Sequence, residues 1–185
     1  SKDAVGGSLG PSRLWFTFGY GIVNEIYWPR IDLPQIRDLG FIVADGRGFW
    51  SEVKRSGDYR IRPVAPGVPA FEVVHTHSRY VLRLRISPDP RRDVLSIESD
   101  LQSDDSDMGL YVLLAPHLGA TGHENRAVVA QHRGRRVLWA ERSPFALALA
   151  AVDEKQEDAI VRASCGYVGI SDGWQDFACN GAMTW

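Results

Sequence analysis

Histidine, carboxylate and aromatic side chains are the groups in this 185-residue sequence whose types and spacing could do chemistry. His75 and His77 are one residue apart, so a strand would place both imidazoles on one face, as at the start of a metal site. No Cys, third His or carboxylate follows at a diagnostic spacing, and Arg79, Arg83 and Arg85 on the same face would repel a cation. We therefore interpret the pair as part of a solvated strand face and expect neither a metal nor another cofactor.

A second candidate is an acidic cluster made of Asp100, Asp104, Asp105 and Asp107. Carboxylate oxygens are the ligands that Ca²⁺ prefers in proteins. The cluster lacks the alternating ligand register, the glycine and the terminal glutamate of a calcium loop. It predicts a polar hairpin turn in place of a cation site.

Four carboxylates in aromatic-rich surroundings could supply an acid and a base for glycoside hydrolysis: Glu25, Asp32, Asp38 and Glu52. Such a pair must face one another across a cleft, which the sequence does not reveal. Both aspartates lie near an arginine in the sequence, so turn hydrogen bonds and ion pairs are the simpler interpretation. The sequence also contains neither a Gly-x-Ser-x-Gly motif nor a phosphate loop, and we expect no catalytic residue in it.

Aromatic residues crowd the first fifty positions: Trp15, Tyr20, Tyr27, Trp28, Phe49 and Trp50. Exposed rings of this kind can stack against sugars, whose C–H groups meet the negative face of the ring. The alternative interpretation is that most of these rings fill the core of the domain.

The composition is that of a globular protein, with 44% hydrophobic and 24% charged residues. A net charge of -2 lacks the basic footprint of a nucleic-acid binder. No stretch approaches the roughly 20 apolar residues that cross a bilayer, so we expect neither a nucleic acid nor a membrane as partner. Cys165 and Cys179 are too few for a disulfide scaffold, which leaves stability to a hydrophobic core.

Strand periodicity extends over almost the whole sequence and is clearest between residues 71 and 86, where either one half-buried strand or a pair of strands fits. There, Val74 to Ile86 at even positions form one face and His75 to Arg85 at odd positions form the other. The apolar run 109–115 predicts a strand covered on both faces. Strands are expected over residues 13–18, 22–28, 36–44, 48–53, 71–86, 93–100, 109–115, 127–131, 136–141 and 145–152.

Helix signals are scarce. Residues 146–151 are rich in Ala and Leu, which favour helix, but Pro144 and the neighbouring strands favour a strand. Only residues 171–178 are typical of a helix start, with Ser171 as the cap. About eleven short strands with so little helix predict an all-β protein, a large antiparallel β-sandwich.

The two ends indicate a piece of a longer protein, because the sequence starts without Met and stops after an apolar Ala-Met-Thr-Trp. We expect one β-sandwich domain over residues 1–185, incomplete at both ends. A truncated sandwich exposes unpaired strand edges, so we expect self-association through them. For the same reason Trp174, Phe177 and Trp185 are expected to be partly exposed.

A family resemblance is carried by residues 24–46, which read Asn-Glu-Ile-Tyr-Trp-Pro-Arg-Ile-Asp-Leu-Pro-Gln-Ile-Arg-Asp-Leu-Gly-Phe-Ile-Val-Ala-Asp-Gly. They resemble the N-terminal domain of bacterial glucoamylases and glucodextranases, glycoside hydrolase family fifteen. Similar stretches follow the family order at residues 2–6, 13–17, 114–118 and 166–176. The resemblance implies a β-sandwich of the supersandwich type, with a catalytic (α/α)₆ barrel downstream that this sequence lacks.

In that family the barrel holds the two catalytic glutamates that release glucose with inversion, so no catalytic residue is carried over to this sequence. The resemblance implies a non-catalytic accessory domain that packs against and stabilises the barrel of the same polypeptide, an exo-hydrolase acting on an α-glucan. The alternatives are an autonomous carbohydrate-binding module that uses exposed aromatics, and a parent protein that is no longer a hydrolase. The candidate sugar-binding or interdomain residues are Trp15, Tyr20, Trp28, Trp50, Asp32 and His117.

Two properties of the parent protein do not follow from these residues. Specificity for α-1,4 or α-1,6 linkages should reside in the barrel. The compartment depends on a signal peptide upstream, with an extracellular or periplasmic location if one exists and a cytoplasmic location otherwise.

Overall fold

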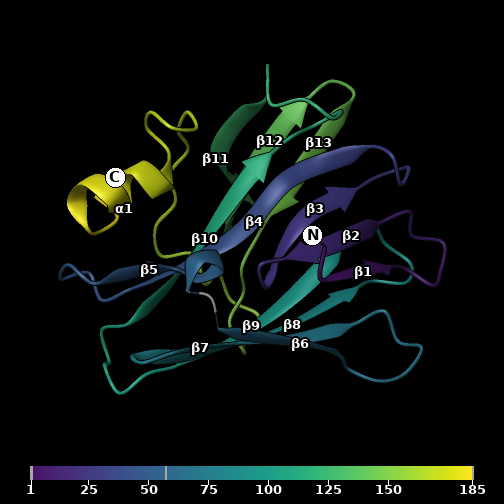
Figure 1. Ribbon diagram of the computed structural model, residues 1–185. Coiled ribbons are helices and arrows are strands. Elements are labelled where there is room, and N and C mark those ends of the chain that lie inside the picture. The colour runs from purple at the N-terminus through teal and green to yellow at the C-terminus, as the bar shows by residue number, and fades with distance from the viewer. Residues whose placement is uncertain (1, 57, 185) are drawn as a thin grey trace.

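The computed structural model describes residues 2–56 and 58–184, which form three antiparallel sheets and one short α-helix (Figure 1). The first sheet has the order β1 (Ala4–Gly7), β2 (Trp15–Gly19), β3 (Ile22–Tyr27), β4 (Pro34–Ala44) and β10 (Gly109–Pro116), and β5 (Trp50–Glu52) pairs with the end of β4. The second sheet has the order β6 (Tyr59–Pro63), β7 (Phe71–His77), β8 (Tyr80–Pro88) and β9 (Leu95–Gln102). The third has the order β11 (Arg126–His132), β12 (Arg135–Arg142) and β13 (Phe145–Leu149).

The main core lies between the first two sheets. Phe16 and Phe18 of β2 meet Phe71 of β7 edge to face, with ring centroids 6.3 and 5.1 Å from that of Phe71. Val73 and Leu82 are fully buried in the same cluster. Two sheets that bury one apolar face each against the other form a sandwich, which confirms the predicted all-β fold.

Residues 71–86 form a pair of strands, one of the two alternatives that the pattern allowed, but the faces predicted for the first half are wrong. His77 pairs with Tyr80 across a two-residue turn, so odd positions of β7 share a face with even positions of β8. His75 is therefore fully buried, and the predicted solvated histidine face does not exist. Its Nε2 lies 2.8 Å from the carbonyl oxygen of Gly21, and burial lowers the pKa of the imidazole.

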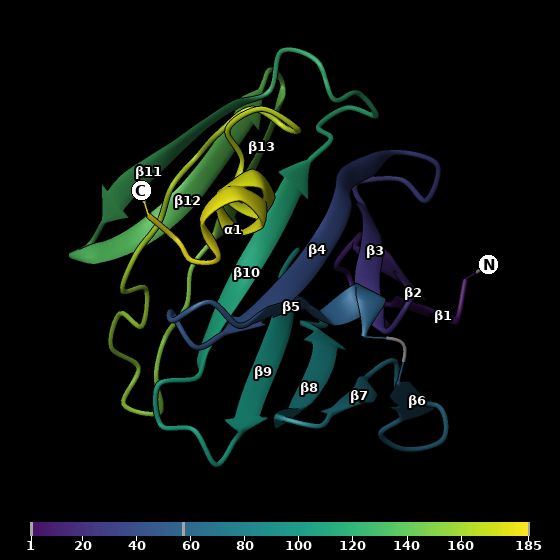
Figure 2. The same cartoon turned by 60° about the vertical axis from the view of Figure 1, so that its left-hand side comes forward.

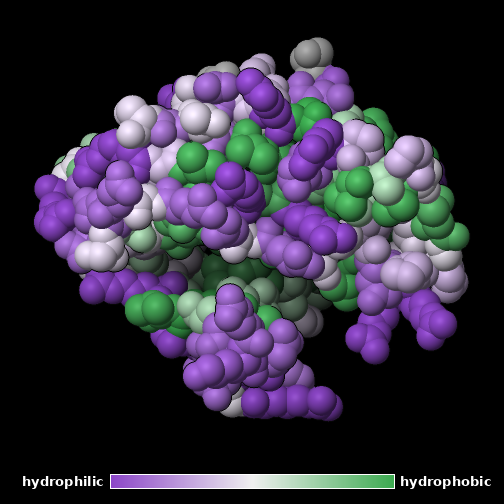
Figure 3. All heavy atoms as spheres, turned by 90° about the horizontal axis from the view of Figure 1, so that it is seen from below, coloured by the Kyte–Doolittle hydropathy of each residue, from purple (hydrophilic) through white to green (hydrophobic). Residues whose placement is uncertain are grey.

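The predicted coverage of residues 109–115 on both faces is only partly correct. Leu110 and Leu114 of β10 face the main core, while Tyr111 and Leu113 face a second, smaller cluster. Val112 lies on the same face as Leu110 and Leu114 but is 40% exposed. Seen from below, the surface is hollowed between polar lobes, and hydrophobic residues line the hollow (Figure 3).

The helix α1 (Gly173–Asn180) packs on the second cluster and lies beside β10 (Figure 2). Asp172 caps the helix by accepting a hydrogen bond from the Gln175 backbone N–H at 3.0 Å, so the cap is one residue later than predicted. Phe177 is buried against Tyr111, contrary to its predicted exposure, whereas Trp174 is partly exposed as expected. Trp185 lies outside the described residues.

The sequence pattern does not predict two edge strands, β1 of the first sheet and β6 of the second. β1 contains two glycines, and β6 contains Arg60, Arg62 and Pro63, which are all poor strand signals. β1 and β6 form because their backbones pair with β2 and β7, and residue types do not predict such pairing. Within the described part of the chain, no helix has the length and hydropathy to cross a membrane.

Candidate functional site

The six residues expected to bind sugar or a second domain fall into two regions: Trp15, Trp28, Asp32 and His117 lie at the end of the first sheet where β3 ends and β4 begins, and Tyr20 and Trp50 lie toward its other end. Trp15 is on β2, Tyr20 is exposed in the β2–β3 turn, and Trp50 is on β5 beneath α1. Asp32 lies in the exposed loop after β3, where it forms an ion pair with Arg30. Trp28 and His117 are held by a common partner.

Gln35, a buried residue of β4, connects Trp28 and His117. Its side-chain amide donates to the Trp28 carbonyl oxygen at 2.6 Å, and its backbone carbonyl accepts from the His117 N–H at 2.9 Å. The Trp28 ring packs edge to face on Phe145 with centroids 6.4 Å apart, and the guanidinium of Arg13 lies over it at 5.2 Å. These contacts fix the end of the first sheet against β13, which is a structural role.

Glu25 lies with aromatic neighbours on the outer face of β2 and β3. Its carboxylate accepts from the Tyr27 hydroxyl at 2.5 Å and from the Thr17 hydroxyl at 3.3 Å, and it pairs with Lys2. Burial and the negative charge of Glu25 raise the pKa of Tyr27 to about 12. Although burial opposes ionisation of Glu25, these donors outweigh it and lower the pKa of the carboxyl, so Glu25 is poorly suited to act as a general acid.

Asp38 and Glu52 are the candidate carboxylates that share a partner. The Nζ of Lys54 lies 3.2 Å from Asp38 and 3.4 Å from Glu52. The ammonium group therefore occupies the space between them in which an inverting hydrolase would hold its water. The predicted ion pairing of Asp38 is correct in kind, but the partner is Lys54 and not the neighbouring Arg37.

The acidic cluster is tied to arginines. Asp105 accepts from Arg47 at 2.8 Å and from Arg79 at 3.2 Å, and Asp107 accepts from Arg47 at 2.6 Å. The backbone N–H of Asp107 and these guanidinium groups lower the pKa of Asp105. The segment joins β9 to β10, which pair in different sheets, so the predicted hairpin is in fact a crossover. Among residues 2–56 and 58–184, no three His, Cys, Asp or Glu side chains gather as a metal site.

A hollow of about 340 Å³ lies beneath α1, which we call the indole hollow. Its lining comes from β5, η1 (Val53–Arg55), β7 and α1 and consists of Trp50, Ser51, Glu52, Arg55, Ser56, His77 and Trp174. The Trp50 and Trp174 rings meet at 84° with centroids 5.9 Å apart. This is the place where aromatic faces and hydrogen-bonding groups converge.

Buried Glu52 holds two of the lining side chains, Trp174 and Arg55, in place. One of its oxygens, Oε2, accepts from the Trp174 indole N–H and from Arg55 Nε, both at 2.7 Å. Arg55 in turn lies over the Trp174 ring at 5.3 Å. On the far wall, His77 stacks on Tyr80 at 4.8 Å. Each lining group is therefore held by contacts within the protein before any ligand arrives.

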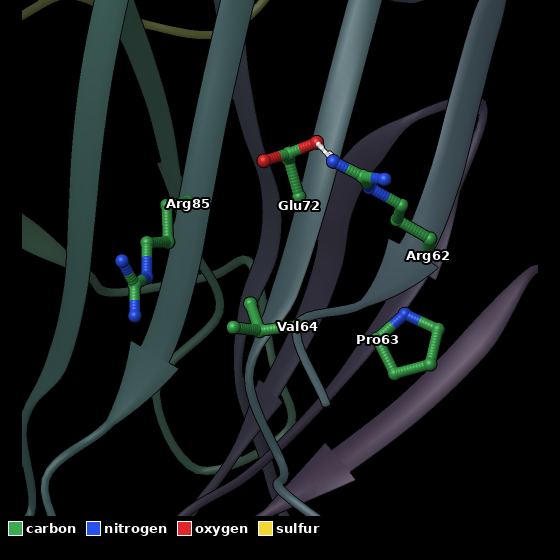
Figure 4. Close-up of a pocket in the computed structure, with 5 residues that line it drawn as sticks. All are labelled: Arg62, Pro63, Val64, Glu72 and Arg85. Atoms are coloured by element: carbon green, nitrogen blue, oxygen red, sulfur yellow. Dashed lines mark hydrogen bonds and ion pairs between the residues drawn. The ribbon is translucent and has the colours of Figure 1, made fainter. Parts of the chain in front are cut away.

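A second hollow of about 180 Å³ lies on the outer face of β6, β7 and β8. It is lined by Arg62, Pro63, Val64, Glu72 and Arg85, and Arg62 pairs with Glu72 (Figure 4). This lining contains no aromatic ring and belongs to a charged ladder that faces solvent. We therefore regard the indole hollow as the stronger candidate site.

The sequence singles out four residues of the indole hollow, each for a different reason: Trp50 as a sugar-binding candidate, Glu52 as a candidate carboxylate, His77 as one of a histidine pair and Trp174 as a partly exposed ring. It does not show that they lie together. Trp174 is 122 positions away from Glu52, and no local periodicity connects such distant residues. The one available signal was the Gly-Trp-Gln-Asp stretch at the start of α1, which belongs to the family pattern.

Comparison with known proteins gives a consistent set of relatives. The family model described as "Glucodextranase, domain N" matches residues 1–185. A glucoamylase from Clostridium sp. (strain G0005) is 26% identical over 178 residues, which are 94% of this chain and 25% of that protein. The crystal structure of a bacterial glucoamylase complexed with acarbose is 25% identical with a TM-score of 0.77, over 80% of this chain and 23% of that one. The chain thus spans about a quarter of the length of these relatives.

Proposed function

Because the chain belongs to the family of glucodextranase N domains, we propose that it is a non-catalytic accessory domain of an α-glucan exo-hydrolase. In this proposal the parent enzyme is of the glucoamylase or glucodextranase type. The domain packs against the catalytic barrel of the same polypeptide and stabilises it. The barrel supplies the two catalytic carboxyl groups and binds the glucan.

The observation that carries the proposal is an uncovered apolar segment before α1. Val161, Tyr167, Val168 and Ile170 are between 78% and 81% exposed. Tyr167, Val168 and Ile170 belong to one turn, and monomeric soluble proteins rarely expose several such side chains together unless a partner covers them. The segment has no strand or helix of its own, and Tyr167, Val168 and Ile170 lie in a turn in which the backbone N–H of Ile170 donates to the Tyr167 carbonyl oxygen at 3.0 Å. We name these four residues the apolar segment.

The candidate carboxylates support the non-catalytic part of the proposal. Asp38 and Glu52 are bridged by Lys54, and Glu25 is held by three donors. An inverting hydrolase needs one protonated carboxyl and one free carboxylate with water between them. Neither arrangement fits these groups, so we expect the chain alone to release no glucose from maltooligosaccharide or dextran.

The experiment that tests packing uses the triple variant Tyr167→Ser, Val168→Ser and Ile170→Ser in two contexts. In the isolated chain the thermal midpoint should stay within about 2 °C, because these side chains already face solvent. In the parent protein we expect the midpoint for loss of hydrolase activity to fall by about 5 °C or more, because the apolar segment then loses its cover.

Leu9→Ser is the matched control, since Leu9 is equally exposed but lies before β2, away from the apolar segment. It should leave both midpoints unchanged. Equal midpoints for the parent protein and its triple variant would overturn the docking role of the segment. Glucose release by the isolated chain at an appreciable rate would overturn the non-catalytic role.

A further inference from the structure

The indole hollow has the physical character of a sugar subsite. Its two indole rings stand almost perpendicular, at 84°, and both are only partly buried. A sugar ring has apolar C–H faces and a polar rim of hydroxyl groups, so it needs aromatic and hydrogen-bonding walls in the same place. Of the two hollows described above, only this one offers both.

The polar groups of the hollow are suited to hydroxyl groups. Arg55 uses Nε for its pair with Glu52, and its side chain is 68% exposed, so other guanidinium N–H groups can donate to a ligand. The Ser51 hydroxyl accepts from Tyr80 at 3.1 Å, which leaves its own proton available for donation. Both donors stand beside the indole of Trp50 in the lining.

The charges of the lining favour a neutral ligand. Glu52 and Arg55 carry opposite charges and lie 2.7 Å apart, so the pair attracts neither a phosphate nor an ammonium group strongly. A volume of about 340 Å³ is at the small end of ligand sites, which run from roughly 300 to 1,000 Å³. These two properties favour a small neutral group.

We propose that the indole hollow binds a neutral hexose unit of an oligosaccharide, with its ring against Trp50 or Trp174 and its hydroxyls on Arg55 and Ser51. The walls are preorganised, because Glu52 holds Trp174 and Arg55 and thereby lowers the ordering cost of binding. The site is additional to the packing role and does not depend on it. It is a binding site, since Glu52 is already occupied by two cationic side chains and an indole.

The test is a titration of the ¹⁵N-labelled chain with maltoheptaose and with isomaltotriose, observed at the tryptophan indole N–H signals. We expect saturable shifts of the Trp50 and Trp174 signals, with a dissociation constant of about 1–10 mM for at least one sugar. The Trp139 signal, on β12 of the third sheet, should not move. Glucose 6-phosphate should bind no more tightly than glucose.

Two arginine variants provide a matched pair. Arg55→Ala removes an exposed donor of the indole hollow and should weaken binding at least roughly fivefold. Arg85→Ala removes an exposed arginine of the aromatic-free hollow and should leave the affinity unchanged. Absence of shifts at Trp50 and Trp174 with both sugars, or equal losses in the two variants, would overturn the site. Either result would leave the packing proposal standing, because that proposal is tested on the apolar segment.

Discussion

The two sides of the β-sandwich differ in how well their core residues are covered. On the side of β2, β3, β7 and β8, Phe16 and Leu82 are completely buried. On the side of β9 and β10, Ile97 and Leu110 belong to the same cluster but are only partly buried, and Val112 is 40% exposed. We call these the closed side and the open side. The residue types are alike, so the difference comes from the neighbours: β9 and β10 are the last strands of their sheets.

The edge strands β6 and β10 also differ in charge, whereas β1 is uncharged and β9 carries Glu98 and Asp100. The edge strand β6 carries Arg60, Arg62 and Pro63, which discourage pairing with another chain. The edge strand β10 has eight residues and no charge at all. An uncharged edge of this length is typical of a strand that has a neighbour on each side. We therefore expect the uncharged edge of β10 to pair with another chain when the isolated chain is concentrated.

The largest expected effect is the cost of truncating a core leucine on the closed side. Leu82→Ala should lower the free energy of unfolding by about 3–5 kcal/mol, because it leaves a cavity in a fully packed region. Leu110→Ala on the open side should cost only about 1–2 kcal/mol, because solvent already reaches that side chain. Urea unfolding of both variants measures the difference, and equal costs would remove the distinction between the two sides.

The next largest effect is expected at Gly21, in the tight turn between β2 and β3 on the closed side. Gly21 has φ +71°, and a Cβ there would lie 2.4 Å from Cε1 of buried His75. Gly21→Ala should therefore destabilise the chain by about 2–4 kcal/mol through both strain and overpacking. Gly46→Ala is the control, because Gly46 has a similar φ of +67° but open space around its Cα. Its cost should be about 1 kcal/mol, and a comparable loss in both variants would assign the effect to the backbone alone.

The fold was largely predictable because strand periodicity is a local property. The strand at residues 145–149 was recognised despite its Ala and Leu content, because Pro144 and the neighbouring strands outweighed helix propensity. The burial of His75 was not predictable from the alternation alone. The two-residue turn between β7 and β8 places the odd positions of β7 on the same face as the even positions of β8. A continuous alternation cannot reveal where this exchange of faces takes place.

The candidate site was less predictable than the fold for the same physical reason. Trp50 stands out as an aromatic residue in the sequence, but its place in a candidate site depends on the contact with Trp174 of α1, which is distant in sequence. Likewise Lys54 decides the role of Asp38, and the sequence offered the nearer Arg37 as partner. Contacts between distant residues are set by sheet order, which local patterns do not encode.

A smaller effect concerns the pH dependence of the closed side. Burial lowers the pKa of His75 below its ordinary value of 6.5, so the unfolded chain binds a proton more readily than the folded chain. The contribution of neutral His75 to the free energy of unfolding is therefore complete above pH 6.5. It is lost as the pH falls from 6.5 toward the pKa of His75 in the folded chain, by up to about 1.4 kcal/mol per pH unit. Urea unfolding at pH 7.5 and pH 5.5 measures the loss. In His75→Gln the loss should shrink, and an identical loss would assign the pH dependence to other groups.

The smallest effect on folding, and the most direct probe of the open side, is Val112→Lys. The side chain at position 112 is 40% exposed, so a lysine can place its ammonium in water and should change the free energy of unfolding by less than about 0.5 kcal/mol. A charge beside an uncharged edge nevertheless disfavours strand addition. We expect the isolated chain to self-associate through β10 in sedimentation experiments and the variant to sediment as a monomer. A strictly monomeric wild-type chain at high concentration would mean that the open side needs no cover, since an uncharged β10 edge would then be stable in water.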